Sequence, residues 1–121
     1  MQVVMVKSDK DRVKKVTKLI RLAGNQIGSV RFVKRSDGTR RRMSFRLHVT
    51  EPTYAPQPTG KRIRDRKAKD RKNLQMTVFD VNKINYNHKG RMNGRGNWRT
   101  IPLESVTRVA VNGEIYKIME V

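Results

Sequence analysis

The sequence predicts a small, mainly β fold in which an N-terminal α-helix precedes five or six short antiparallel strands, with two long basic loops between them. We expect the strands to form a closed or nearly closed barrel, because closure removes exposed sheet edges. Three observations predict this fold. Residues 8–23 have helical periodicity, two Xaa-Gly pairs separate strand-like segments, and 121 residues with 36% hydrophobic content can enclose one modest core. We therefore expect a single domain over residues 1–121.

Residues 8–23 are predicted to form the helix. Ser8 is a suitable N-cap, and the acids at positions 9 and 11 suit the positive end of the helix dipole. Gly24 is expected to end the helix. The apolar residues recur every three or four positions and form one stripe: Val13, Val16, Leu19, Ile20 and Ala23.

Residues 27–49 are predicted to form a hairpin around a two-residue turn at Asp37-Gly38. Counting outward from this turn pairs Phe32 with Met43 and Val30 with Phe45, so one face of the hairpin is apolar. The other face is polar or basic, as a half-buried antiparallel sheet requires.

The predicted register sets like charges opposite each other at the hairpin tip, with Arg35 opposite Arg40 and Lys34 opposite Arg41. Such a pair is destabilising by a few tenths to about 1 kcal/mol. A phosphate lying across the tip would turn this repulsion into attraction. The outward face behind the tip adds three more arginines: Arg31, Arg42 and Arg46.

Residues 50–73 are predicted to be a basic insertion. Three prolines interrupt its first half, and residues 61–72 hold eight basic and two acidic residues. We expect a flexible polycation that becomes ordered along a nucleic-acid backbone. The alternative is a short helix, in which Arg62, Arg66 and Lys69 would share a face.

The remaining chain is predicted to supply the other strands. Residues 74–82 form a strand, residues 83–97 form a second, glycine-rich insertion, and residues 98–119 form the closing strands. The last two strands are expected to meet at Asn112-Gly113, another strong two-residue turn signal.

Two aromatic residues, Tyr86 and Trp98, lie among basic residues in and beside the second insertion. Such interleaving can hold single-stranded nucleic acid by base stacking. The whole chain has only seven aromatic residues, which favours a core or barrel-rim position for Trp98 and favours duplex over single-stranded partners.

The strand segments at residues 78–81, 98–106 and 111–116 are similar to those of small bacteriophage proteins with an Sm-like or SH3-like β-barrel, related to WYL domains. The resemblance covers most of the chain apart from the two insertions. It implies a phage protein that acts on nucleic acid in the host cytoplasm, as a modulator of the nucleoid or of transcription. The chain lacks the Trp-Tyr-Leu triplet that names WYL domains, so the resemblance does not extend to their ligand pocket.

The charge is concentrated. Lysine and arginine total 29 against 10 acidic residues, which gives a formal charge of +19. This charge opposes compaction, and a polyanion relieves the repulsion. Residues 1–99 carry +20 and residues 100–121 carry −1. We therefore expect a nucleic-acid partner, and we expect the C-terminal hairpin to lie outside the basic surface.

Catalytic and metal-binding chemistry is not expected. The chain has no cysteine, and His48 and His88 lie far apart, so no zinc ligand set forms. Spacing groups no carboxylates for a nuclease metal, and no glycine-rich loop has a complete phosphate-binding motif. We expect no cofactor. The chain has no apolar run of membrane-spanning length, and residues 1–6 are too short for a signal-peptide core, so we expect a cytoplasmic location.

The predicted function is non-enzymatic binding of nucleic acid, of duplex DNA before RNA, through phosphates and with little sequence specificity. The predicted site combines the first hairpin with both basic insertions. Its residues are Arg31, Lys34, Arg35, Arg40, Arg41, Arg42, Arg46, Lys61, Arg62, Arg64, Arg66, Lys67, Lys69, Arg71, Lys72, Arg91, Arg95 and Arg99.

Two other functions stay open at the level of sequence. The protein could dock on an acidic host protein such as RNA polymerase, with the near-neutral C-terminal hairpin as the docking surface. It could also bind structured RNA, as ribosomal proteins do. The oligomeric state is not predicted.

Overall fold

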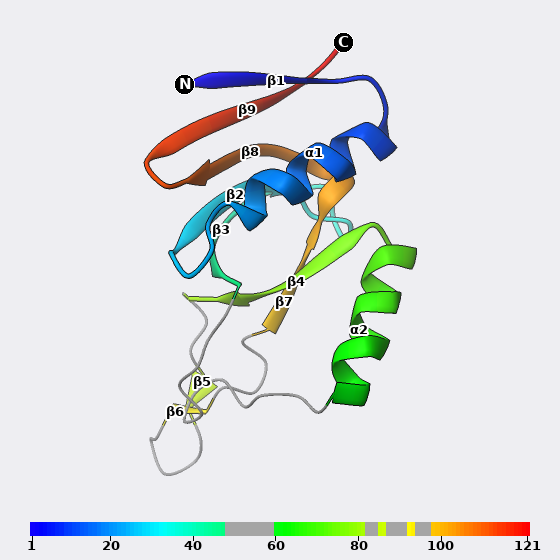
Figure 1. The fold of residues 1–121 in the computed structure, drawn as a ribbon, viewed down its shortest axis with the longest axis vertical. Coiled ribbons are helices and arrows are strands. Elements are labelled where there is room, and N and C mark those ends of the chain that lie inside the picture. Colours follow the sequence, from blue (N-terminus) through cyan, green and yellow to red (C-terminus); the bar gives the residue numbers. More distant parts are fainter. Residues whose placement is uncertain (48–59, 82–84, 87–91, 94–97) are drawn as a thin grey trace.

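The computed structural model describes residues 1–47, 60–81, 85–86, 92–93 and 98–121 (Figure 1). These residues form a mainly β fold with two helices, α1 (Asp9–Arg21) and α2 (Gly60–Lys72), and a short 3-10 turn, η1 (Leu103–Ser105). The predicted mainly β class and the N-terminal helix are confirmed. No helix in the described part of the chain is both long and apolar enough to cross a membrane.

Seven strands form the main sheet, in the order β1-β9-β8-β2-β3-β4-β7. All neighbours are antiparallel except β1 and β9, which are parallel. A separate pair, β5 (Asn85–Tyr86) and β6 (Met92–Asn93), lies within the predicted second insertion. The bounds of the main strands are β1 Gln2–Val6, β2 Gly28–Val33, β3 Arg40–Arg46, β4 Gln75–Asp80, β7 Trp98–Pro102, β8 Val106–Val111 and β9 Glu114–Glu120.

The prediction of five or six antiparallel strands is wrong in number, because β1 also joins the sheet and pairs in parallel with β9. The order leaves β1 and β7 at the two edges, and no ladder joins these edges within the described residues. The described sheet is therefore open.

Helix α1 follows the predicted pattern closely. The hydroxyl of Ser8 accepts a hydrogen bond from the backbone N–H of Asp11 at 3.1 Å, and the Asp11 carboxylate accepts one from the backbone N–H of Lys7 at 3.0 Å. This second bond, together with Lys15, holds the pKa of Asp11 below its ordinary value. Gly24 ends the segment with φ +56°.

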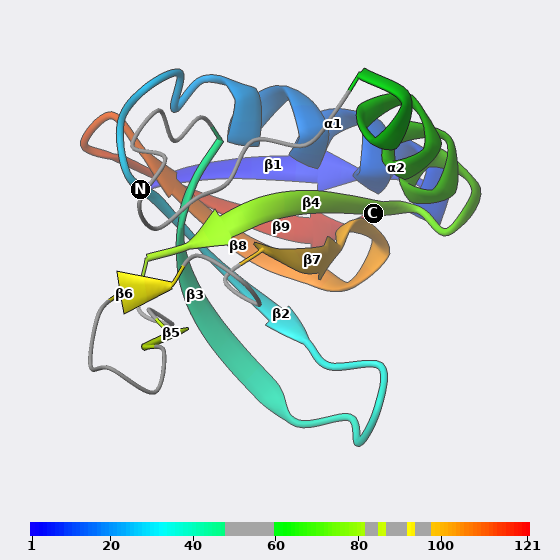
Figure 2. The same ribbon diagram turned by 90° about the horizontal axis from the view of Figure 1, so that it is seen from below.

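The core lies between α1 and the face of the sheet turned towards it, which we call the inner face (Figures 1 and 2). The predicted helical stripe and the apolar face of the first hairpin both contribute, so both predictions are confirmed. The fully buried side chains include Val6, Val16, Ile20, Val30, Phe45, Val78, Ile101, Val106 and Val109.

The register predicted for the first hairpin is wrong by two residues. Phe45 pairs with Gly28, and Met43 pairs with Val30. The type I′ turn that Asp-Gly favours needs positive φ at both Asp37 and Gly38, but only Gly38 has it, at +71°. The Asp37 carboxylate instead accepts hydrogen bonds from the N–H and hydroxyl of Thr39, which also lowers the pKa of Asp37. The turn consequently spans four residues, 35–38, closed by the bond from Lys34 N–H to the Thr39 carbonyl.

The last hairpin has the predicted turn. Asn112 and Gly113 both have positive φ, 51° and 79°, as a two-residue turn of this kind requires. The register that follows pairs Val111 with Glu114 and Arg108 with Lys117.

The prediction of a flexible polycation within residues 50–73 is wrong for residues 60–72. These form helix α2, which is the alternative that the sequence left open. The segment lacks internal proline, and its lysines, arginines and alanine are good helix formers. Residues 48–59 lie outside the described residues.

A glycine in β2 provides a test of the core packing. A Cβ atom at Gly28 would lie 2.6 Å from Cζ of Phe45, whose ring is fully buried. We expect Gly28→Ala to lower the free energy of unfolding by about 1–3 kcal/mol, because the fully buried ring or the backbone would have to shift to make room. Urea unfolding measures this change in free energy. Ser29→Ala, one residue further on the opposite face, should change stability by less than about 0.5 kcal/mol. Equal stability of the two variants would contradict the packing described.

Candidate nucleic-acid interface

Four cations lie side by side on the outer face of the sheet, the face turned away from α1. Strand pairing sets Arg42 of β3 opposite Arg31 of β2, Arg31 opposite Arg108 of β8, and Arg108 opposite Lys117 of β9. We call Arg42, Arg31, Arg108 and Lys117 the cation row. Neighbouring strands lie about 4.8 Å apart, so the row covers about 14 Å.

The alternation of side chains explains why the row faces solvent. On β2 the residues flanking Arg31, Val30 and Phe32, are buried in the core, so Arg31 must point outward. Arg108 shares this face because it precedes the fully buried Val109 and pairs with Arg31; the register shifts on its other side, where Thr107 is exposed. Arg31, Arg42 and Lys117 are exposed, and Arg108 is half-buried.

No carboxylate of the described residues pairs with the cation row. The ion pairs among the described residues are made by other cations: Arg12, Lys15, Lys34, Arg35 and Arg41. Like charges directly opposite each other cost a few tenths to about 1 kcal/mol per pair. The row is therefore a region of uncompensated repulsion, which an anion lying on it would relieve.

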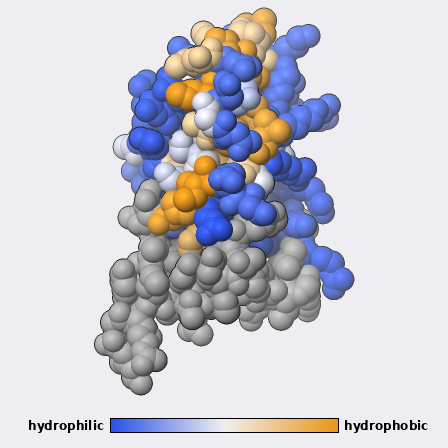
Figure 3. Space-filling view, turned by 60° about the vertical axis from the view of Figure 1, so that its left-hand side comes forward, coloured by the Kyte–Doolittle hydropathy of each residue, from blue (hydrophilic) through white to orange (hydrophobic). Residues whose placement is uncertain are grey.

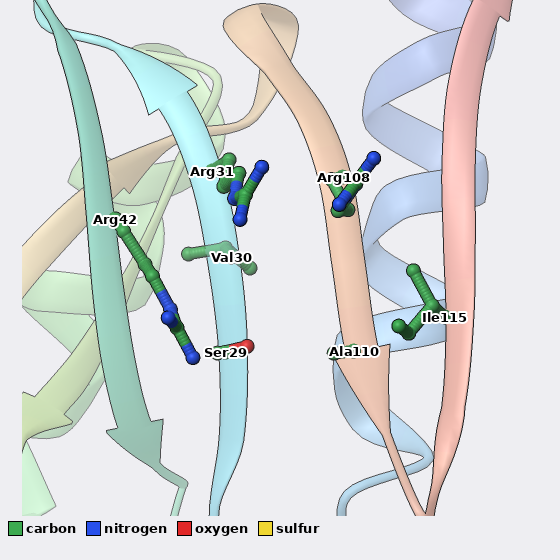
Figure 4. Close-up of a pocket in the computed structure, with 7 residues that line it drawn as sticks. All are labelled: Ser29, Val30, Arg31, Arg42, Arg108, Ala110 and Ile115. Atoms are coloured by element: carbon green, nitrogen blue, oxygen red, sulfur yellow. The ribbon is translucent and has the colours of Figure 1, made fainter.

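A shallow, half-open pocket of about 100 Å³ lies within the row. Its lining combines Arg31, Arg42 and Arg108 with the small or apolar residues Ser29, Val30, Ala110 and Ile115. Figure 4 shows Arg42 extending from β3 towards Ser29 on β2, and the guanidinium of Arg31 beside β2 on the side that faces β8. The three arginines come from three adjacent strands, so backbone pairing fixes the relative positions of their Cα atoms.

The C-terminal hairpin was expected to lie outside the basic surface, and this prediction is wrong. Its two cations, Arg108 and Lys117, both belong to the cation row. Sequence reasoning could have paired them with each other by counting from Asn112-Gly113. It could not have placed them beside Arg31, because the contact between β2 and β8 is non-local.

Arg35, predicted to contact phosphate, is held in internal contacts. Its guanidinium donates to both carboxylate oxygens of Glu104 at 2.9 Å, to the backbone carbonyl of Asn73 at 2.5 Å, and to the side chain of Gln75 at 3.4 Å. It ties the hairpin tip to η1 and to the link between α2 and β4. The predicted pairs of Arg35 with Arg40 and of Lys34 with Arg41 do not form.

Arg41 also has a structural partner. It pairs across the sheet with Phe32, on the core side, and its guanidinium lies 3.4 Å from the carboxylate of Asp80, which is 2% exposed. Arg40, at the start of β3, is exposed. Arg46 lies opposite Phe79 and is half-buried. Of the arginines predicted on this hairpin, Arg31 and Arg42 alone belong to the row.

Helix α2 presents a second group of cations. Its partly buried Asp70 accepts hydrogen bonds from the backbone N–H and hydroxyl of Thr77 and from Gln75, and these bonds attach α2 to β4 (Figures 1 and 2). Arg66 lies over the ring of Trp98, 5.2 Å from its centroid. The exposed cations of α2 are Arg64, Lys67, Lys69, Arg71 and Lys72.

The other predicted site residues are placed only in part. Arg99 is exposed on β7. Lys61 and Arg62 belong to α2, but their side chains, like Arg91 and Arg95, lie outside the described residues. Among the described residues, no three His, Cys, Asp or Glu side chains gather as a metal site would require.

Comparison with protein-family models, with curated proteins and with solved structures found no match to this chain.

The contacts of Arg35 predict a structural role. Arg35→Ala should lower the free energy of unfolding by about 1–2 kcal/mol, because it removes charge-assisted bonds that are partly screened by solvent. Arg40→Ala, which removes an equal charge from an exposed position nearby, should change it by less than about 0.5 kcal/mol. Urea unfolding compares the two variants. A loss of stability in Arg40→Ala as large as that in Arg35→Ala would contradict this assignment.

Proposed function

We propose that the protein is a non-enzymatic nucleic-acid-binding protein that contacts phosphates through the cation row, with duplex DNA as the favoured partner and little sequence specificity. The observation that carries this proposal is the alignment of four cations on four adjacent strands without a carboxylate partner in the described residues.

The chemistry of the row suits phosphate. Each guanidinium offers a planar, two-pronged donor that matches two phosphate oxygens. The row covers about 14 Å, close to the axial rise of four nucleotides along one strand of B-form DNA. Contacts to phosphate do not distinguish one base from another, which supports low sequence specificity.

The surroundings of the row favour duplex over single-stranded partners. The described pocket lining holds no aromatic ring on which a base could stack. Phe79 and Trp98 instead pack edge to face, with ring centroids 5.6 Å apart, and Arg66 covers Trp98. The rings of Phe79 and Trp98 therefore make contacts within the protein.

Helix α2 is proposed as a second source of phosphate contacts, through its five exposed described cations. The cations at 61, 62, 91 and 95 belong to the same proposal. A role of a phage protein in the host nucleoid or in transcription, and closure of the sheet into an Sm-like or SH3-like barrel, are also parts of this proposal that rest on the resemblance in sequence.

Docking on an acidic host protein would use the same cations, since the C-terminal hairpin carries half of the row. Nuclease treatment before a pull-down separates the two functions. Partners that disappear with the nucleic acid support the proposal, and an acidic protein that stays bound contradicts it.

The salt dependence of binding tests the phosphate mechanism. If about six phosphates are contacted, log K should fall with log salt concentration with a slope of about −5 for duplex DNA. Replacing Arg31, Arg42 and Arg108 by Ala should make this slope shallower by about 3, and should weaken all sequences about equally. Fluorescence anisotropy with labelled duplex DNA, single-stranded DNA and RNA measures the slopes and ranks the partners.

A matched control removes the same charge from the other side of the sheet. Lys10, Lys14 and Lys18 are exposed on α1, which packs on the inner face. Replacing all three by Ala should leave the slope within about 1 of the wild-type value, because contacts to phosphate are local. A slope near zero for the wild type, or equal changes in both triple variants, would contradict the proposed interface.

A further inference from the structure

We propose that the pocket within the cation row binds a terminal phosphate monoester, the phosphorylated end of a nucleic-acid strand, in preference to an internal phosphodiester. This inference rests on the proposed function: on a duplex without phosphorylated ends the three arginines contact internal phosphates, and a phosphorylated end takes the place of those phosphates.

The charge around the pocket exceeds what an internal phosphate needs. Arg31, Arg42 and Arg108 all line one pocket, and no carboxylate of the described residues neutralises them. An internal phosphodiester carries one negative charge, whereas a phosphate monoester carries about 1.5 to 2 at pH 7. Three guanidinium groups lining one pocket therefore match the monoester better.

The size of the pocket points to one group and not to a length of backbone. Its volume is about 100 Å³. A cavity of this size is well above the about 10–15 Å³ that one water needs, so it has room for a small polar group. An internal phosphate is flanked by sugar on both sides and must lie along the surface, while a terminal phosphate can enter the pocket end-on.

The rest of the pocket lining suits the sugar that carries a terminal phosphate. Ser29 supplies a hydroxyl, and Ala110 and Ile115 supply an apolar wall. Ile115 is 39% exposed, so it leaves apolar surface open beside the guanidinium groups. The apolar side of a terminal sugar can rest on this wall while its phosphate contacts the arginines.

The backbone of the pocket is preformed. Its seven lining residues lie on strands whose backbones are paired: β3 with β2, β2 with β8, and β8 with β9. Backbone pairing therefore fixes where the three arginine side chains begin, and only the side chains have to become ordered when a ligand binds. The sheet holds the three arginines on neighbouring strands before any nucleic acid arrives.

The test compares one duplex in three forms, with a 5′-phosphate, with a 3′-phosphate and with hydroxyl groups at all ends, binding to the full chain at fixed salt. We expect about tenfold tighter binding of at least one phosphorylated form, the effect of one additional charge-assisted contact. Arg108→Lys keeps the charge but loses the two-pronged geometry, and should bring the ratio close to one. The Lys10, Lys14 and Lys18 triple variant should keep the wild-type ratio.

The outcomes are distinguishable. Equal affinity for all three duplexes, with a steep salt dependence retained, would overturn this inference and leave the proposed function standing. Absence of salt-dependent binding to every duplex would overturn both. A nucleoside monophosphate is added as a competitor: if it binds the pocket with no preference for phosphorylated duplex ends, the site takes a small phosphate ester and the assignment to nucleic-acid ends is wrong.

Discussion

Burial of one face of the sheet determines what the other face presents. The inner face packs against α1, and fully burying an apolar side chain such as Phe45 or Val30 stabilises the fold by about 1.5–3 kcal/mol. That packing fixes the strand register, and the register then aligns Arg42, Arg31 and Arg108 on the outer face. Each like-charged neighbour costs at most about 1 kcal/mol. Core packing therefore outweighs the repulsion, and the sheet holds these cations on neighbouring strands with no carboxylate partner among the described residues.

The two helices are attached to the sheet by different kinds of interaction. Helix α1 buries an apolar stripe, while α2 has no side chain in the described core and is attached through polar contacts. Asp70 bonds Thr77 and Gln75, and Arg66 covers Trp98. Five described cations of α2 take no part in these contacts and are exposed: Arg64, Lys67, Lys69, Arg71 and Lys72. Helix α2 is therefore ordered while these cations stay accessible to solvent.

Local patterns were sufficient to predict α1, its Ser8 cap, the apolar face of the first hairpin and the turn at Asn112-Gly113. The register of the first hairpin could not be predicted, because the Asp37 side chain bonds Thr39 and favours a longer turn over the two-residue one. The cation row itself depends on the pairing of β2 with β8, a contact between segments far apart in sequence. The internal roles of Arg35 and Arg41 likewise depend on Glu104 and Asp80, and no local spacing indicates them.

NMR titration with a short duplex, followed through the side-chain Nε–Hε signals of individual arginines, tests directly whether nucleic acid binds at the cation row. We expect Arg31, Arg42 and Arg108 to shift together and to saturate at the same duplex concentration, while Arg12 and Arg35, which are paired with carboxylates, shift little. Shifts confined to arginines outside the row, with Arg31, Arg42 and Arg108 unchanged, would contradict it.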